Sequence, residues 1–485
     1  MNPLLYTDGY KVDHRRQYPE HTTMVYSNWT PRQSRIKGVD NVILFGLQYF
    51  IKKYMIEDFQ HNFFDQPKEK IVTQYSKRIN NYLGENKVGT EHIAALHDLG
   101  YLPIIIKAIP EGDSVPLRTP MFTVYNTLPD FFWLTNYFET ILSTTVWLPC
   151  TSATIALQYR RLLDSYAKET STAEEMVNWQ GHDFSMRGMA GLEAAMMSAA
   201  GHLLSFTGTD TIPAIDFLEE YYNADAGQEL IGGSVAATEH SVMCMGTNEG
   251  EQNTFERLIT QIYPNGIVSI VSDTWDLWKV LTEYLPNLKE QILARDGKVV
   301  IRPDSGDPVN IICGDPNGKT TKEQKGVIEL LWDVFGGITN TKGYKELDAH
   351  IGAIYGDSIT LERAEQICKR LKDKGFASTN IVLGIGSFTY QYNTRDTFGF
   401  AMKATYGEVN SEGRAIYKNP ITDDGTKRSA KGLITLIKEN GAYKMLDSVS
   451  KDEEQKGELK TVYKDGVLLV DHTLKDIRAR VQKNS

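Results

Sequence analysis

Four short apolar segments in the second half of the chain each end at a polar cluster, and this pattern constrains the fold more than any other. The segments are 267–271, 299–301, 351–355 and 381–383, and the clusters that follow them lie at 272–273, 302–306, 356–358 and 384–386. Stretches with helical spacing, such as 276–293 and 361–374, separate them. A repeated order of strand, polar turn and helix is typical of a parallel α/β barrel, whose chemistry lies at the carboxyl ends of its strands. We therefore expect the active site at these four clusters, in an irregular α/β barrel resembling a TIM barrel.

The length and charge of the chain limit its class. Its 485 residues, 41% of them hydrophobic, suffice for a large core and more than one domain. The formal charge of -10 argues against a nucleic-acid partner, because such proteins need a basic face. The four cysteines are widely spaced, which favours neither a disulfide framework nor a zinc site and fits a reducing cytosol. We expect a cytoplasmic protein.

Membrane insertion is not expected. The first 16 residues include Asp8, Lys11, Asp13, Arg15 and Arg16 with no apolar core between these charges, which excludes a secretory signal peptide. The most apolar stretch, 131–157, is interrupted by Asn136 and Glu139, so we interpret it as buried helices.

Both ends of the chain differ from the middle because they alternate β-rich segments with turn signals. The turns are expected at 111–113, Asn440-Gly441 and Asp465-Gly466, and Asn-Gly and Asp-Gly between apolar strands favour hairpins. The expected domains are an N-terminal α+β region at 1–174, the barrel at 175–395, and a C-terminal α+β region at 396–485 that packs with the N-terminal region.

The glycine-containing segment 384–387 follows an apolar strand. Glycines there let backbone N–H groups form a concave site for phosphate oxygens, although a tight turn requiring positive φ explains them equally well. A basic series downstream favours a phosphorylated substrate; it comprises Arg395, Lys403, Lys418, Lys427 and Arg428. Taken alone, Lys427 and Arg428 are better explained by a solvated loop.

Asp273, Asp304 and Asp357 each follow a predicted strand. Carboxylates in this position accept hydrogen bonds from sugar hydroxyls or hold Mg²⁺ through water. Each is also a candidate helix N-cap, and an Asx-turn is a serious alternative for Asp304. Three at equivalent barrel positions favour a functional role.

A further group of candidates lies earlier, in the segments 182–188, 206–210 and 238–241. Its aromatic ring, cation, carboxylates and histidines suit a flat heteroaromatic ligand with a polar substituent. By default Phe184 is a core residue, and His182 and His240 are hydrogen-bonded structural histidines. No Ser-His-Asp arrangement can be assigned.

At these residues the sequence resembles the nicotinamide phosphoribosyltransferase family of type II phosphoribosyltransferases. The resemblance runs from end to end; its motifs are Thr7-Asp8-Gly9-Tyr10-Lys11, Gln17-Tyr18-Pro19, Phe45-Gly46-Leu47-Gln48-Tyr49, Trp133-Leu134-Thr135-Asn136, His182-Asp183-Phe184, Gly208-Thr209-Asp210-Thr211, Glu239-His240-Ser241, Ile301-Arg302-Pro303-Asp304-Ser305-Gly306, Gly356-Asp357, Thr394-Arg395-Asp396 and Lys427-Arg428-Ser429. It implies the joining of nicotinamide to phosphoribosyl pyrophosphate, which yields nicotinamide mononucleotide and pyrophosphate in NAD salvage.

The resemblance also implies roles around the base. Phe184 would stack on one face of nicotinamide, and Tyr10 from the other subunit of a homodimer on the opposite face. Asp210 would accept a hydrogen bond from the carboxamide nitrogen, and Arg302 would lie against the base and its amide oxygen. Asp8 and Ser269 are further expected substrate-binding residues.

Further implied roles concern the ribose, the phosphates and two cofactors. The ribose and 5′-phosphate would contact Arg187, Asp304, Gly356 and Asp357, the loop from Gly384 to Gly386, and Arg395 and Lys403 of the partner subunit. His240 would be phosphorylated by ATP, with Asp273 beside it and Lys418 and Lys427 near the pyrophosphate or nucleotide. Asp273 and Asp304 would hold Mg²⁺ through water.

Two departures from the family pattern concern the phosphate region. The family's glycine run continues where this chain has Ser387-Phe388, and a family serine is replaced by Ala401. Two rival functions remain: a nicotinate phosphoribosyltransferase, which the Asp210 charge disfavours, and a non-catalytic nucleotide-binding or secreted signalling protein.

Overall fold

The computed structural model describes residues 1–356, 358–417 and 430–483. The chain divides into two units, the first built from residues 1–154, 217–224 and 393–484 and the second from 155–216 and 225–392. Helices α6 (Glu139–Thr170) and α9 (Pro213–Tyr222) contribute residues to both units. The expected domain limits at 174 and 395 stay predictions.

The second unit is organised around a parallel sheet with the order β7-β6-β14-β13-β10-β9-β8. All of its paired neighbours are parallel. Its strands are β6 (Gly181–Asp183), β7 (Gly208–Thr209), β8 (Ala236–Ala237), β9 (Val268–Val271), β10 (Val299–Arg302), β13 (Ile351–Tyr355) and β14 (Ile381–Ile385). In the described part of the chain β7 and β8 are the edge strands. The seven paired strands form a curled half-barrel.

The four apolar segments singled out in the sequence are strands β9, β10, β13 and β14, and they are hydrogen-bonded neighbours. Val299 of β10 pairs with both Val268 of β9 and Ile351 of β13, which places the three strands in one register. Near-continuous burial along β9 and β13 explains why these segments are apolar at every position instead of alternating. The prediction of a parallel sheet is confirmed.

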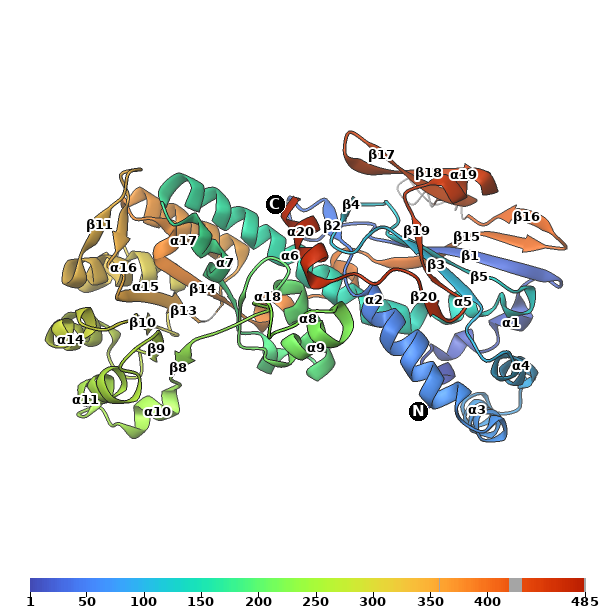
Figure 1. Ribbon diagram of the computed structural model, residues 1–485, viewed down its shortest axis with the longest axis horizontal. Coiled ribbons are helices and arrows are strands. Elements are labelled where there is room, and N and C mark those ends of the chain that lie inside the picture. Colours follow the sequence, from blue (N-terminus) through green and yellow to red (C-terminus); the bar gives the residue numbers. More distant parts are fainter. Residues whose placement is uncertain (357, 418–429, 484–485) are drawn as a thin grey trace. The chain divides into compact units, whose positions relative to one another are not determined.

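Helices cover this sheet, as Figure 1 shows for α15, α16 and α17 beside β10 and β13. The predicted helix at 361–374 is α17; Thr360 caps it, and Ala364, Ile367, Cys368 and Leu371 form its buried face. The predicted helix at 276–293 is interrupted, because Pro286 falls inside it. The helices of this unit are α7 (Val177–Gln180), α8 (Leu192–His202), α10 (His240–Met245), α11 (Glu251–Arg257), α12 (Leu277–Lys279), α13 (Leu285–Asn287), α14 (Lys289–Leu293), α15 (Pro308–Cys313), α16 (Thr321–Phe335), α17 (Leu361–Asp373) and α18 (Ser387–Tyr390).

The first unit contains an antiparallel sheet with the order β16-β15-β1-β5-β3-β19-β20, so strands from both chain ends pair within it. Trp29 of β1 is fully buried and stacks on Phe122 of β5 and on Phe400. The strands are β1 (Thr22–Thr30), β3 (Ile104–Ala108), β5 (Phe122–Asn126), β15 (Ala401–Val409), β16 (Glu412–Ala415), β19 (Lys460–Lys464) and β20 (Val467–Leu468).

Two of the three expected hairpins are confirmed, at Asn440-Gly441 between β17 (Leu433–Glu439) and β18 (Ala442–Val449) and at Asp465-Gly466 between β19 and β20. The turn at 111–113 leads into β4 (Ser114–Pro116), which pairs with β2 (Asn41–Ile43), so no tight hairpin forms there. The strands expected on either side of this turn, β3 and β5, nevertheless pair antiparallel with each other. A third small ribbon, in the second unit, joins β11 (Gly337–Thr339) to β12 (Lys345–Leu347).

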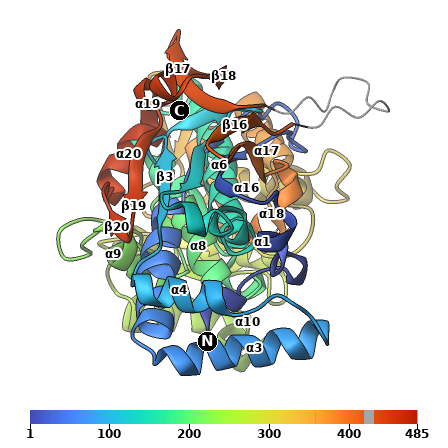
Figure 2. The same ribbon diagram turned by 90° about the vertical axis from the view of Figure 1, so that its right-hand side faces the viewer.

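The helices of the first unit include α3 and α4, which lie next to each other in Figure 2. They are α1 (His14–Gln17), α2 (Leu47–Phe50), α3 (Lys68–Leu83), α4 (Glu91–Leu99), α5 (Leu134–Tyr137), α19 (Lys451–Lys456) and α20 (Leu474–Lys483). Among the described residues only α6 is long and apolar enough to cross a membrane, yet 78% of its most apolar window is buried in the protein. Helix α6 is therefore a core helix, which agrees with the interpretation of the apolar stretch 131–157 as buried helices.

Candidate active site

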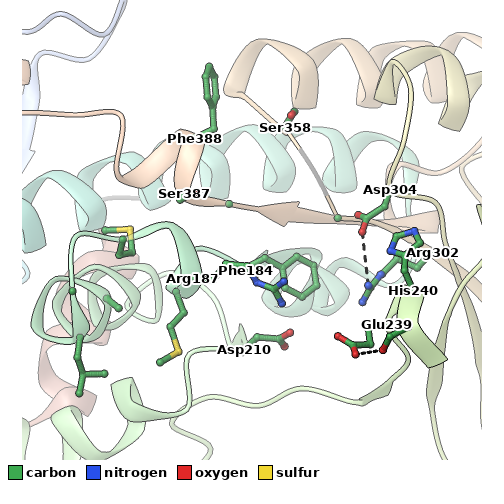
Figure 3. A pocket seen from close by; sticks show the side chains of 18 residues that line it. Phe184, Arg187, Asp210, Glu239, His240, Arg302, Asp304, Ser358, Ser387 and Phe388 are labelled. Carbon is green, nitrogen blue, oxygen red and sulfur yellow. Dashed lines mark hydrogen bonds and ion pairs between the residues drawn. The ribbon is translucent and has the colours of Figure 1, made fainter. Parts of the chain in front are cut away.

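A pocket of about 1110 Å³ opens at the carboxyl ends of the parallel strands, all within the second unit. Residues at or just past the carboxyl ends of six strands line this pocket. These residues are Phe184 (β6), Asp210 (β7), Glu239 and His240 (β8), Arg302 and Asp304 (β10), Gly356 (β13) and Gly386 (β14). Figure 3 shows Phe184, Asp210, Arg302 and His240 around one cavity. Three of the four clusters predicted from the sequence line this pocket, and Asp273 of the fourth contacts Asp304 beside it.

One end of the pocket combines an aromatic ring with a carboxylate. The imidazole of His182 lies behind Phe184 with ring centroids 4.5 Å apart, and its Nε2 donates to Oδ1 of Asp210 at 2.8 Å. The hydroxyl of Ser234 donates to the same oxygen, also at 2.8 Å. Burial alone would raise the pKa of the Asp210 carboxyl, but the His182 and Ser234 hydrogen bonds and the nearby Arg302 charge together hold that pKa below its ordinary value. Asp210 is therefore ionised at neutral pH.

A buried carboxylate fixes the backbone beneath this end. Asp183 is fully buried and accepts from the backbone N–H and hydroxyl of Ser185 and from the hydroxyls of Thr209 and Thr211. Its own carbonyl accepts from the Asp210 N–H at 2.9 Å. These bonds tie the ends of β6 and β7 together, so the two segments that carry Phe184 and Asp210 are held in one geometry.

Gly356 after β13 and Gly384 within β14 provide room for side chains. A Cβ at Gly384 would lie 2.6 Å from the Phe184 ring, and one at Gly356 would lie 2.4 Å from Asp304 Oδ1. Gly384 belongs to β14 and not to the turn, and neither Gly384 nor Gly386 has a positive φ. The interpretation of this segment as a turn that requires positive φ is therefore wrong, because close side-chain approach explains Gly384 instead.

The opposite end of the pocket is lined by His240, Arg302 and Asp304, and Asp273 lies next to them. Asp273 Oδ2 accepts from the Asp304 N–H at 2.8 Å and from the Ser305 hydroxyl at 2.6 Å. Asp273 Oδ1 lies 3.3 Å from His240 Nε2, within ion-pair distance but without hydrogen-bond alignment. Arg302 and Asp304 approach to 3.8 Å. The side chain of His240 is 48% exposed.

The N-cap alternatives for two aspartates are wrong. Asp276 caps α12 and Asp307 caps α15, each three residues after Asp273 and Asp304 respectively. Asp273 instead holds the loop that carries Asp304. Asp304 lines the pocket.

Several expected site residues lie elsewhere. Tyr10, Asp8, Arg395 and Lys403 belong to the first unit, where Tyr10 is 64% exposed, Asp8 bonds Thr140 and Lys403 lies on β15. Ser269 is buried on β9, and its hydroxyl has no hydrogen-bond partner among the described residues. Asp357, Lys418 and Lys427 fall outside the described residues.

Some lining residues were not anticipated. Glu239 reaches the pocket beside His240 and accepts from the Ser241 hydroxyl. Met186, Met189 and Leu192 form an apolar wall next to Arg187. Ser234 lies in a loop without any distinguishing sequence pattern. Glu239 belongs to the Glu239-His240-Ser241 motif, which by itself does not indicate a role for the carboxylate.

The carboxylates suit a water-mediated Mg²⁺ better than a closed metal cage. No group of three or more potential ligands occurs among the described residues. Asp273 Oδ2 already accepts two hydrogen bonds, whereas Asp304 lines the pocket. Mg²⁺ commonly binds through one or two carboxylates together with substrate phosphates, and the residues present fit that arrangement.

Comparison of the sequence with protein-family models identifies the class of enzyme to which this fold and pocket belong. Residues 179–467 match the model of the nicotinate phosphoribosyltransferase (NAPRTase) family, and residues 2–106 match the nicotinamide phosphoribosyltransferase N-terminal domain. The chain belongs to the NAPRTase family of phosphoribosyltransferases.

Two individual relatives are similar to this chain over most of its length. A nicotinamide phosphoribosyltransferase from Acinetobacter baylyi is 54% identical over 99% of this chain and 97% of its own length. A protein of the same name from Mycoplasma pneumoniae is 39% identical over 89% of this chain and 95% of its own length.

Two solved structures share the fold at low identity. The nicotinate-nucleotide pyrophosphorylase from Pyrococcus furiosus has a TM-score of 0.60 at 14% identity, covering 100% of this chain and 95% of its own. Human nicotinic acid phosphoribosyltransferase has a TM-score of 0.53 at 15% identity, covering 98% of this chain and 93% of its own. At such identities they support the architecture alone.

Proposed function

We propose that this chain transfers the phosphoribosyl group of phosphoribosyl pyrophosphate to nicotinamide, which gives nicotinamide mononucleotide and pyrophosphate for NAD salvage. The observation that carries the proposal is the Asp210 carboxylate, which accepts hydrogen bonds from His182 and Ser234 and lines the pocket together with the Phe184 ring. The name of the Acinetobacter baylyi relative, at 54% identity, supports the same reaction.

The pocket suits an amide better than an acid. Asp210 accepts from the carboxamide N–H of nicotinamide, Phe184 stacks on the ring, and Arg302 lies against the amide oxygen. Nicotinate would bring a second negative charge, and two like charges about 4 Å apart at an effective dielectric near 20 repel by roughly 4 kcal/mol, or about three decades in affinity. The rival function of a nicotinate phosphoribosyltransferase is therefore disfavoured.

The reaction requires positioning and charge stabilisation. As pyrophosphate leaves, the ribose carbon gains oxocarbenium character, and the pyridine nitrogen must be held in line with it. Asp304 and Gly356 contact the ribose. Arg187 and the segment from Gly384 to Gly386 bind the 5′-phosphate. The reaction needs no protein nucleophile.

Two further components complete the proposal. Asp304, with Asp273 behind it, would hold Mg²⁺ through water, and the bound ion would neutralise charge on the pyrophosphate. The exposed imidazole of His240 would accept the γ-phosphoryl group of ATP with release of ADP, so that a new N–P bond replaces the broken P–O bond. The Asp273 carboxylate near His240 would stabilise a positively charged ring.

The proposal also covers assembly and fold. A homodimer would bring Tyr10, Arg395 and Lys403 of one subunit to the pocket of the other. The curled sheet would close as an irregular barrel, because Gly233, just before β8, makes a parallel bridge to Gly208 of β7. We place the enzyme in the cytoplasm.

A product assay tests the proposed function. The purified chain is given phosphoribosyl pyrophosphate and Mg²⁺ with either nicotinamide or nicotinate, with and without ATP, and the mononucleotide is quantified by chromatography. We expect turnover of nicotinamide, turnover of nicotinate at least about 100-fold slower, and stimulation by ATP. A folded chain that uses only nicotinate, or neither base, would contradict the proposal.

A further inference from the structure

One buried side chain contacts both residues that the proposed function assigns to the base. His182 of β6 is 7% exposed and is not among the residues that line the pocket. Its ring packs behind Phe184 at a centroid distance of 4.5 Å and an interplanar angle of 46°, while its Nε2 lies 2.8 Å from Asp210 Oδ1. It can therefore act on a bound base only through Phe184 and Asp210.

The place of the imidazole is fixed by the neighbouring strand. His182 is paired with Gly208 of β7, and a Cβ atom at Gly208 would lie 2.6 Å from His182 Nδ1. The missing side chain at Gly208 thus leaves the space in which the ring lies. Because an ionised carboxylate only accepts hydrogen bonds, His182 Nε2 must carry the proton that it shares with Asp210.

The hydrogen bonds to Asp210 are unequally shared between its two oxygens. His182 and Ser234 both donate to Oδ1, each at 2.8 Å, and no described residue donates to Oδ2. Figure 3 shows the carboxylate of Asp210 directed into the cavity, below Phe184. Oδ2 is thus available to accept from a ligand, and a ligand amide can supply that proton whereas a ligand carboxylate cannot.

We propose that His182 is a positioning residue for base selection: it occupies Asp210 Oδ1, so that Oδ2 faces the ligand as an acceptor, and it supports the Phe184 ring from behind. This inference rests on the proposed function and adds to it the residue that orients the selective carboxylate. Loss of the donor changes the preference between amide and acid, whereas loss of the ring changes the affinity for the base.

Four substitutions separate these two effects. His182→Phe keeps a ring behind Phe184 but removes the donor, and His182→Gln keeps a donor at the position of Nε2 but removes the ring. His182→Asn is polar yet too short to reach Asp210. The matched control is His350→Phe, because His350 also bonds an aspartate, Asp348, at 2.7 Å, but lies outside the pocket.

The measured quantity is kcat/KM for nicotinamide divided by kcat/KM for nicotinate, together with KM for phosphoribosyl pyrophosphate. Hydrogen bonds to charged groups are strong enough that His182→Phe and His182→Asn should each lower the ratio about tenfold or more. His182→Gln should keep the ratio within about threefold of wild type while KM for nicotinamide rises several-fold, because the lost ring contact affects binding of the base. KM for phosphoribosyl pyrophosphate should stay within about twofold in all variants, and His350→Phe should change nothing.

The outcomes distinguish this inference from the proposed function. A wild-type chain that makes no nicotinamide mononucleotide contradicts the proposed function itself. An active wild type with an unchanged ratio in folded His182→Phe overturns only the role of His182. If His182→Phe does not fold, equal ratios in His182→Asn and His182→Gln overturn it instead, since only the longer amide reaches Asp210.

Discussion

The ring of Phe184 packs against Gly384 so closely that a Cβ atom at Gly384 would lie 2.6 Å from Cδ2 of the ring and 2.8 Å from the carbonyl oxygen of Tyr355. The carbonyl belongs to strand β13 and cannot move aside without disturbing the sheet. Strand β14 thus determines how deep the Phe184 ring lies in the pocket.

Gly384→Ala should displace Phe184, raise KM for nicotinamide at least several-fold and lower the free energy of unfolding by about 1–3 kcal/mol. Steady-state kinetics and urea unfolding measure the two effects. Gly386→Ala is the stability control, since no atom lies within 4 Å of a Cβ at Gly386. Equal stabilities of the two variants would show that the Phe184 contact is not tight.

Asp210→Asn should weaken the use of nicotinamide and relax the discrimination against nicotinate. The substitution removes an acceptor for the carboxamide and also the charge that repels the acid, so the ratio of kcat/KM values should fall by about one to three decades. The measurement is the competition of the two bases for phosphoribosyl pyrophosphate. An unchanged ratio would exclude Asp210 as the selective residue.

Stability should fall on mild acidification, in part because of His202. This imidazole is fully buried, with Nδ1 2.7 Å from the Tyr390 hydroxyl and Nε2 near the carbonyls of Gly181 and Gly208, and burial lowers its pKa from the ordinary 6.5 to about 4. Between these values the unfolded chain binds a proton that the folded chain does not, so stability is lost as the pH falls, by about 1.4 kcal/mol per pH unit.

The test compares urea unfolding of wild type and His202→Gln at pH 6 and pH 5. Between pH 6 and pH 5 the free energy of unfolding should fall less in the variant than in wild type, and the difference between the two losses should be about 1.4 kcal/mol. His92 and His472, whose pKa values burial also lowers to about 4, contribute equally to both proteins. Identical losses would show that His202 is not neutral in the folded state.

The sequence predicts the parallel sheet well because its strands are buried on both faces and therefore continuously apolar. For the same reason the polar residues that follow those strands, such as Arg302 and Asp304, could be assigned to one site from the sequence. The edge strands β7 and β8 have two residues each, too few to show a pattern.

Other features depend on distances that a sequence does not contain. Gly384 is quoted in a glycine-rich segment, yet its packing against Phe184 requires the register of β14 against β6, where Gly384 pairs with His182. The role of Asp273 in holding the Asp304 loop likewise depends on two loops meeting, and the N-cap alternative was reasonable until Asp276 and Asp307 were seen to cap the helices.

His240→Ala should abolish ATP hydrolysis and lower product formation while the fold is retained. The imidazole is exposed in the pocket and lies near Asp273, as a phosphoryl acceptor requires. Release of ADP measures the first effect, and circular dichroism with the Tm checks the fold. His350→Ala, at a histidine outside the pocket, is the control. A folded His240→Ala chain that still hydrolyses ATP would exclude the phosphohistidine.

The final prediction concerns shared active sites. Tyr10 and Arg395 belong to the first unit of the chain, and Phe184 and Asp210 to the second, so the two sets of residues can be altered separately. A symmetric dimer would build two identical sites, each from the first unit of one subunit and the second unit of the other. A monomer should then be inactive.

Mixing a chain that carries Tyr10→Ala and Arg395→Ala with a chain that carries Phe184→Ala and Asp210→Asn tests this assembly. In each heterodimer all four lesions fall in one site and the other site is wild type, so activity per heterodimer should approach half that of the wild-type dimer if the sites are independent. Differential tags isolate the heterodimers, and each parental homodimer gives the background rate. Activity no higher than that of the parents in verified heterodimers would mean that Tyr10 and Arg395 serve the pocket of their own subunit, because lesions in both sets would then leave no complete site.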